Sequence, residues 1–158
     1  MRKNLLSLLP LSLAVLVIAL FVPTDAMAAC TNNIYGTYGS DVIYGTSAND
    51  CIYADPGNDT IYGGGGDDEI YAGSFCTYCV DDRDTAWGGD GHDYIDGWTD
   101  NDNLFGEAGN DSLYGFQGDD DLFGGDGDDY LNGEGHNDYA DGGAGTDTCA
   151  AESTVNCP

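Results

Sequence analysis

Residues 106–132 read GEAGNDSLY-GFQGDDDLF-GGDGDDYLN, which are three consecutive nine-residue blocks of one design. In each block the first and fourth residues are Gly, the sixth is Asp and the eighth is Leu. A fixed nine-residue period predicts a solenoid, in which each repeat is one small structural unit stacked on its neighbours.

The period runs from Gly36 to Ala150 in twelve blocks, of which one, residues 72–87, is seven residues longer than the others. The eighth position is occupied by Ile43, Ile52, Ile61, Ile70, Ala86, Ile95, Leu104, Leu113, Leu122, Leu131, Ala140 and Cys149. The sixth position is always aspartate, as Asp41, Asp50, Asp59, Asp68, Asp84, Asp93, Asp102, Asp111, Asp120, Asp129, Asp138 and Asp147.

Each block divides into a turn and a short strand. Residues one to six are mostly Gly, Asp, Asn, Ser and Thr, which favour turns because Gly tolerates positive φ and Asx side chains bond to the local backbone. Residues seven to nine are mostly β-branched, aromatic or aliphatic, as in Val42-Ile43-Tyr44, and predict a strand with its middle side chain facing inward. The density of Gly excludes helices, so an all-β fold is expected.

Two blocks carry a specific resemblance. Residues 88–95 (GGDGHDYI) and 124–131 (GGDGDDYL) match G-G-x-G-x-D-x-U-x, where U is a large apolar residue, and residues 142–147 (GGAGTD) match its loop portion. The chain therefore resembles the RTX, or hemolysin-type, calcium-binding nonapeptide repeat proteins. The likeness spans residues 36–150.

The resemblance implies a parallel β-roll with two nonapeptides per coil, in which calcium lies between loops two repeats apart. Carboxylate and carbonyl oxygens suit calcium, which takes about 6–8 oxygen ligands. Roughly six to nine bound calcium ions are expected. The implied metal site comprises the twelve sixth-position aspartates together with Gly88, Gly89, Gly91, Gly106, Gly109, Gly124, Gly125, Gly127, Gly142, Gly143 and Gly145.

The long block is the main departure from the pattern. Its Asp84 keeps the register, yet its loop is too long to be standard, so the Asp59–Asp84 and Asp84–Asp102 pairings are expected to be poor sites, with Arg83 able to stand in for an ion. The fourth position also departs from Gly at Asp100 and at Ala48 and His136.

The N-terminal segment predicts export. Arg2 and Lys3 precede the apolar run 5–22, and Ala26-Met27-Ala28 supplies small residues for cleavage, so residues 1–28 read as a signal peptide. An uncleaved anchor and a lipoprotein signal ending at Cys30 are the alternatives. We expect a secreted protein, extracellular, periplasmic or on the cell surface. The expected parts are the signal 1–28, an N-terminal cap 29–35, the repeats 36–150 with an insertion at about 73–80, and a C-terminal cap 151–158.

Charge limits the candidate partners. Removal of residues 1–28 leaves 28 of the 29 acidic residues and a single cation, Arg83, so the net charge is −27. Such a chain repels nucleic acid and anionic membranes, and no membrane insertion is expected after cleavage. Folding requires a counter-charge that the sequence does not supply, and divalent cations are the natural source.

The six cysteines of an exported chain predict disulfides, although six cysteines allow fifteen pairings. Proximity in sequence favours Cys30 with Cys51, Cys76 with Cys79, and Cys149 with Cys157. The Cys76-x-x-Cys79 pair has two alternatives, half of a zinc site or a redox pair.

No G-x-S-x-G or H-E-x-x-H motif occurs, and no enzyme activity is expected. The leading function is a calcium-dependent structural or adhesive module. The alternative is a calcium-dependent module that binds a glycan or protein partner through an aromatic face. Ninth-position side chains in alternate blocks would form that face: Tyr44, Tyr62, Trp87, Phe105 and Phe123. Cross-strand packing alone also explains these rings, and their irregular polar neighbours argue against ice binding.

Overall fold

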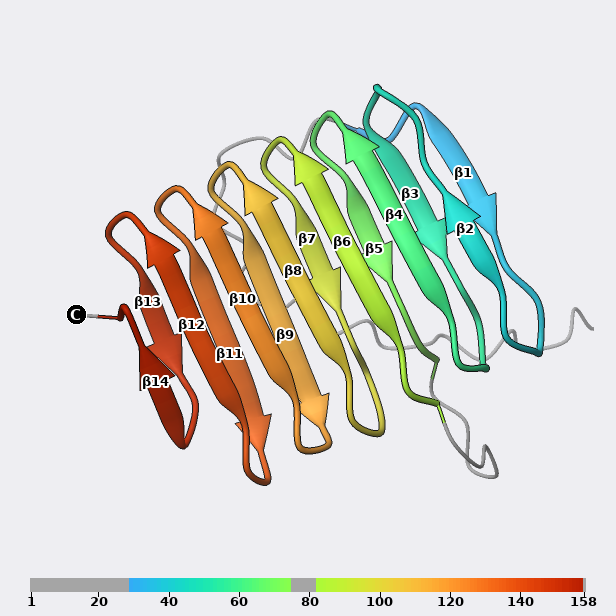
Figure 1. The fold of residues 1–158 in the computed structure, drawn as a ribbon. Helices are drawn as coiled ribbons and strands as arrows, with labels where there is room; N and C mark the ends of the chain where they lie inside the picture. The colour runs from blue at the N-terminus through green and yellow to red at the C-terminus, as the bar shows by residue number, and fades with distance from the viewer. Residues whose placement is uncertain (1–28, 75–81, 158) are drawn as a thin grey trace, which may run out of the picture.

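Two seven-stranded parallel sheets face each other in the computed structural model, which describes residues 29–74 and 82–157 (Figure 1). The chain alternates between the sheets, so that odd-numbered strands form one sheet and even-numbered strands form the other. We call these the odd sheet and the even sheet. The expected signal peptide and the Cys76–Cys79 pairing lie outside the described residues.

The strands follow one another along the solenoid axis in the order of the chain. The odd sheet contains β1 (Asn32–Tyr35), β3 (Asp50–Tyr53), β5 (Glu69–Tyr71), β7 (Tyr94–Asp96), β9 (Ser112–Gln117), β11 (Tyr130–Gly135) and β13 (Thr148–Ala150). The even sheet contains β2 (Val42–Tyr44), β4 (Thr60–Gly65), β6 (Thr85–Asp90), β8 (Asn103–Ala108), β10 (Asp121–Asp126), β12 (Tyr139–Ala144) and β14 (Ser153–Val155).

The register makes one coil equal to two nonapeptides. Ile95 of β7 lies opposite Leu113 of β9, eighteen residues further along the chain. Between β4 and β6 the offset rises to twenty-five residues, with Ile61 opposite Ala86, yet the pairing remains parallel and in phase. The strand register is therefore the same on both sides of the long block, and the predicted all-β parallel β-roll is confirmed.

The core is a narrow double column between the sheets. The eighth-position side chains from Ile43 to Ala140 are all buried, and most are fully inaccessible. Ala54 and Ala72, at first positions, complete the column. Because each repeat contributes about one apolar side chain, no repeat forms a core alone and burial depends on stacking.

The two ends of the solenoid differ. Disulfides join Cys30 to Cys51 at the first coils and Cys149 to Cys157 at the last, which confirms two of the three predicted local pairings. Large apolar side chains are most exposed on the first coil, at Tyr35, Tyr38, Val42 and Tyr44. Within residues 29–74 and 82–157 there is no helix with the length and hydrophobicity needed to span a bilayer.

Candidate metal centre

The sixth-position aspartates form a ladder along each edge of the solenoid, at the start of the strands. Asp111 Oδ1 accepts a hydrogen bond from the backbone N–H of Asp93 at 2.8 Å, and Asp129 Oδ1 accepts one from the N–H of Asp111 at 2.8 Å. The odd-sheet ladder comprises Asp50, Asp68, Asp93, Asp111, Asp129 and Asp147. The even-sheet ladder comprises Asp41, Asp59, Asp84, Asp102, Asp120 and Asp138.

The second carboxylate oxygen of most ladder residues has no partner. Ten Oδ2 atoms are buried and accept no hydrogen bond from the described part of the chain. They belong to Asp59, Asp68, Asp84, Asp93, Asp102, Asp111, Asp120, Asp129, Asp138 and Asp147. Since an unpaired buried carboxylate is strongly unfavourable, each of these atoms requires a proton or a cation.

First-position glycines keep space open beside these oxygens. A Cβ on Gly106 would lie 2.3 Å from Asp111 Oδ2 and 2.6 Å from the carbonyl oxygen of Gly124. A carboxylate oxygen and a carbonyl oxygen of adjacent coils thus approach one point. Hard oxygens converging in this way fit calcium. Gly88, Gly124 and Gly142 likewise stand beside the Oδ2 of their own block's aspartate.

Fourth-position glycines bring the loop backbones together. Gly109 has φ 144°, and a Cβ there would lie 1.5 Å from the carbonyl oxygen of Gly91. A larger residue would therefore force the stacked loops apart. Positive φ angles also occur at six other glycines of the expected site: Gly89, Gly91, Gly125, Gly127, Gly143 and Gly145.

Burial makes the ladder carboxyls weak acids. Desolvation raises the pKa of Asp111 to about 7 and that of Asp93 to about 8, partly offset by the N–H of the preceding coil. Neighbouring carboxylates contribute to both of these raised pKa values, because like charges disfavour ionisation. At neutral pH a cation is the ligand that allows these groups to stay ionised together.

The ladder runs through the long block without interruption. Asp84 Oδ1 accepts from the N–H of Asp59 at 2.8 Å, and the N–H of Asp84 donates to Asp102 Oδ1 at 2.8 Å. The Asp59–Asp84 and Asp84–Asp102 pairings, which the sequence made doubtful, thus have the same hydrogen bonds as the other pairs of the ladder. The reason is that the chain has returned to the repeat register by Asp84. Arg83 forms no ion pair with any of the described carboxylates, and its side chain is exposed.

The two ends of the ladders differ from the interior, and the sequence missed only Glu152 among the residues there. Asp41 and Asp50 begin the two ladders, and their Oδ2 atoms accept from the N–H groups of Thr37 and Thr46. At the other end Glu152 Oε2 accepts from the N–H of Asp138 at 3.0 Å. Glu152 therefore takes the place of the next aspartate beyond the last full repeat.

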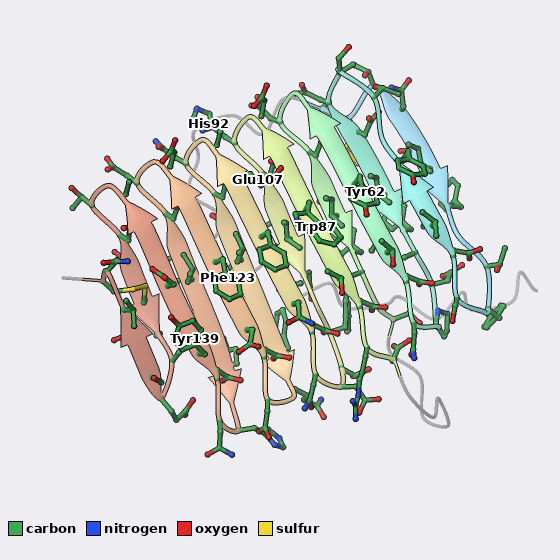
Figure 2. The ribbon with its side chains drawn as sticks, viewed as in Figure 1. Tyr62, Trp87, His92, Glu107, Phe123 and Tyr139 are labelled. Carbon is green, nitrogen blue, oxygen red and sulfur yellow. A yellow bond between two sulfur atoms is a disulfide. The ribbon has the colours of Figure 1, made fainter. Side chains whose placement is uncertain are left out.

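A further ladder of fifth-position side chains lies on the outer side of the loops. Asp67 Oδ1 accepts from the N–H of His92 at 3.0 Å, and His92 Nδ1 accepts from the N–H of Asn110 at 2.7 Å. Figure 2 places His92 at a loop tip of the solenoid edge. The feature of the sequence that could have predicted this ladder is the recurrence of side chains with hydrogen-bond acceptors at position five. These side chains accept from backbone N–H groups of the next coil rather than from their own turn.

Aromatic rings cover the outer face of the even sheet, where Figure 2 shows Tyr62, Trp87, Phe123 and Tyr139 in a row. The centroids of Tyr62 and Trp87 are 4.8 Å apart with an angle of 7° between the planes, and those of Trp87 and Phe105 are 5.3 Å apart with 8°. Each inner ring therefore has both faces covered by neighbouring rings and presents its edge to solvent.

The odd sheet carries a second row, although two of its ninth positions are the non-aromatic Asp96 and Asn132. Tyr94 and Tyr130 fill the breaks from the seventh position, because residues two apart on a strand share a face. Tyr94 and Tyr114 have centroids 5.3 Å apart, and Tyr114 and Tyr130 have centroids 5.6 Å apart.

Comparison with protein families agrees with this geometry. The pattern described as RTX calcium-binding nonapeptide repeat matches the chain in four copies, at residues 31–61, 45–75, 80–113 and 114–149. The matches cover both ladders and most of the strands. A search of curated proteins gives no match.

Proposed function

Since the chain belongs to the RTX calcium-binding nonapeptide repeat family, we propose that it is a secreted β-roll whose coils fold as calcium fills the spaces between stacked loops. The supporting observation is the set of ten buried Oδ2 atoms without a partner among the described residues. Eight of them lie beside a first-position glycine, which leaves space for a ligand.

The proposed ligands are the ladder aspartates and the loop carbonyls around them. In one such unit Asp111 Oδ2 and the carbonyl oxygen of Gly124 would both face the ion, with Gly106 leaving room for it. Bound calcium supplies positive charge that offsets carboxylate repulsion and replaces lost hydration. The expected roughly six to nine ions allowed for the loss of one or two sites at the long block. With one ion for each unpartnered Oδ2, the limit becomes ten.

Folding and binding are coupled in this proposal. The apolar column is thin and the net charge beyond residue 28 is −27, so repulsion and chain entropy oppose the calcium-free fold. Calcium binding would then supply folding free energy directly, as it does wherever the unfolded chain has no preformed site.

The role of the folded rod is proposed to be structural or adhesive. Proteins with these repeats are typically extracellular, and the repeats are generally structural or binding elements rather than catalytic ones. The disulfides at both ends of the rod suit an oxidising compartment. Paired ring faces favour a packing role for the aromatic row over glycan stacking, which needs a free ring face.

Circular dichroism during calcium titration tests the proposal, with the disulfides intact. We expect a largely unfolded spectrum in chelator and a cooperative gain of β structure on adding calcium. Magnesium is the matched control ion, because it demands octahedral geometry with short bonds and keeps its waters, and it should induce far less structure. Identical β spectra in chelator and in calcium would refute the coupling of folding to calcium.

A further inference from the structure

The edge of the solenoid at the long block contains a carboxylate that no repeat position predicts. Asp82 stands two residues before the ladder residue Asp84 and is fully buried. Its position corresponds to the fourth of a repeat, where the neighbouring even-sheet loops carry Gly57, Asp100 and Gly118. A buried carboxylate replaces the usual glycine there.

Asp82 repeats the bonding of a ladder aspartate. Its Oδ1 accepts from the N–H of Gly57 at 2.7 Å, and its own N–H donates to Asp100 Oδ2 at 3.1 Å. The three residues form a short second ladder parallel to Asp59, Asp84 and Asp102. Asp82 Oδ2 remains free for another ligand, apart from a long contact of 3.3 Å with the hydroxyl of Thr99.

Three oxygens converge beside Gly73. A Cβ on Gly73 would lie 2.9 Å from the carbonyl oxygen of Gly97, 3.1 Å from Asp82 Oδ2 and 3.4 Å from Asp84 Oδ2. Asp84 Oδ2 is buried and has no hydrogen-bond partner in residues 29–74 and 82–157. The regular unit beside Gly106 has one carboxylate oxygen and one carbonyl oxygen, so this one has an additional negative charge.

We infer that Asp82, Asp84 and the Gly97 carbonyl form a cation site that departs from the nonapeptide pattern, because Asp82 adds a second carboxylate, and that its affinity is higher than that of the regular sites. Two adjacent buried carboxylates repel each other, and no Lys, Arg or His of the described chain pairs with them. Affinity for hard cations rises with the number of charged ligands, so calcium, and still more a trivalent lanthanide, suits the site. The inference rests on the proposed function only for the identity of the natural ion.

Trp98 provides a local reporter for this site. It lies between Gly97 and Thr99 in sequence, whereas Trp87, the other tryptophan of the chain, belongs to the aromatic row of the even sheet. Terbium bound near the Gly97 carbonyl should luminesce on excitation of the indole, because energy transfer requires proximity. We expect this signal with the first equivalents of terbium, together with the first gain in β structure. Trp98→Phe should abolish it without changing the number of bound ions.

Two variants test the ligands in different ways. Asp82→Asn removes one negative charge, and Gly73→Ala places a methyl group into the space between the oxygens. Loss even of groups that only support metal ligands weakens metal binding by about 10–100-fold, so the terbium midpoint should rise at least about tenfold in both variants. Calorimetry should show one calcium ion fewer, while cooperative folding at saturating calcium remains.

Asp126→Asn is the matched control, because Asp126 is exposed and its substitution removes the same charge. Asp126→Asn should leave the terbium luminescence at the first equivalents, and its midpoint, unchanged. Unchanged terbium midpoint and calcium stoichiometry in both Asp82→Asn and Gly73→Ala would overturn the inference. If one of these two variants fails to fold, the terbium midpoint and the calcium stoichiometry of the other variant test the inference. Failure of the unmodified protein to fold with calcium would instead contradict the proposed function.

Discussion

Asp111 and Asp93 are joined across successive coils by one carboxylate oxygen, since Asp111 Oδ1 accepts from the N–H of Asp93 at 2.8 Å while Asp111 Oδ2 is buried and unpartnered. One side chain therefore has two separable tasks. Oδ1 fixes the spacing of the coils, and Oδ2 is left available for an ion.

Substitution at Asp111 should separate these tasks. Asn keeps a carbonyl oxygen for the Asp93 N–H but replaces the anionic ligand, whereas Ala removes both. We expect both variants to need more calcium for folding, and Ala to lose about 1–3 kcal/mol more at saturating calcium because a buried N–H is left unpaired. Urea unfolding in excess calcium measures the difference, and equal stability of the two variants would contradict it.

Asp84→Asn should impair calcium-induced folding at least as strongly as Asp111→Asn. The sequence made Asp84 the weaker position, but its bonds to Asp59 and Asp102 match those of Asp111 in length. Calcium titrations of the two variants, followed by circular dichroism, compare them directly. A much smaller shift of the midpoint for Asp84→Asn would show that the long block does interrupt calcium binding.

Acid should partly replace calcium. The carboxyl of an unfolded Asp has a pKa of about 3.9, whereas burial raises that of Asp111 to about 7 and that of Asp93 to about 8. The folded state therefore binds more protons, so its stability without calcium is fully present below about pH 4 and is lost as the pH rises through 7 to 8.

The measurement is the β content in chelator between pH 4 and pH 8.5, and we expect it to fall as the pH rises. In the presence of calcium we expect the opposite dependence on pH. Protons compete with calcium for the same oxygens, so calcium binding is weaker in acid. A β content in chelator that increases with pH would contradict the assignment of raised pKa values to the ladder.

Gly106→Ala should destabilise the calcium-loaded protein by about 1–3 kcal/mol, because its Cβ would overlap Asp111 Oδ2 and the Gly124 carbonyl. Gly135→Ala is the matched control, since a Cβ there meets nothing within 4 Å. Thermal unfolding in calcium distinguishes them. A comparable loss in both variants would mean that chain entropy, not the space beside Asp111, governs these glycines.

Phe105→Ala should lower stability by about 1–3 kcal/mol, since it removes contacts with both Trp87 and Phe123. Tyr38→Ala, at an exposed ring outside the row, should change it little. A glycan array on the calcium-loaded protein addresses the alternative role. Glycan binding that Phe105→Ala abolishes without loss of stability would assign the row to recognition.

The sequence predicted what depends on the period and missed what depends on contacts between coils. The period predicted a solenoid of turns and short strands, and the resemblance to the RTX repeat implied the parallel β-roll and the pairing of alternate blocks. The six-residue strands, such as β8, extend past the predicted three residues because Glu107 and Ala108, in the part of the block that was assigned to a turn, still pair with β6. The role of Asp82 was missed because the seven extra residues of the long block obscure which repeat position it occupies. The role of His92 was missed because its hydrogen-bond partners are eighteen and twenty-five residues away in sequence.

The two aspartate ladders make the solenoid a short, stiff polyelectrolyte. Seven strands at about 4.7–4.9 Å spacing extend about 29 Å, so the 27 net negative charges beyond residue 28 amount to about one per ångström of axis. Double-stranded DNA carries about one per 1.7 Å. Folding into the rod therefore concentrates charge that counterions must offset, and calcium entering the loops displaces monovalent counterions. Apparent calcium affinity then falls as monovalent salt rises, which links the folded length of the rod to the ionic strength around it.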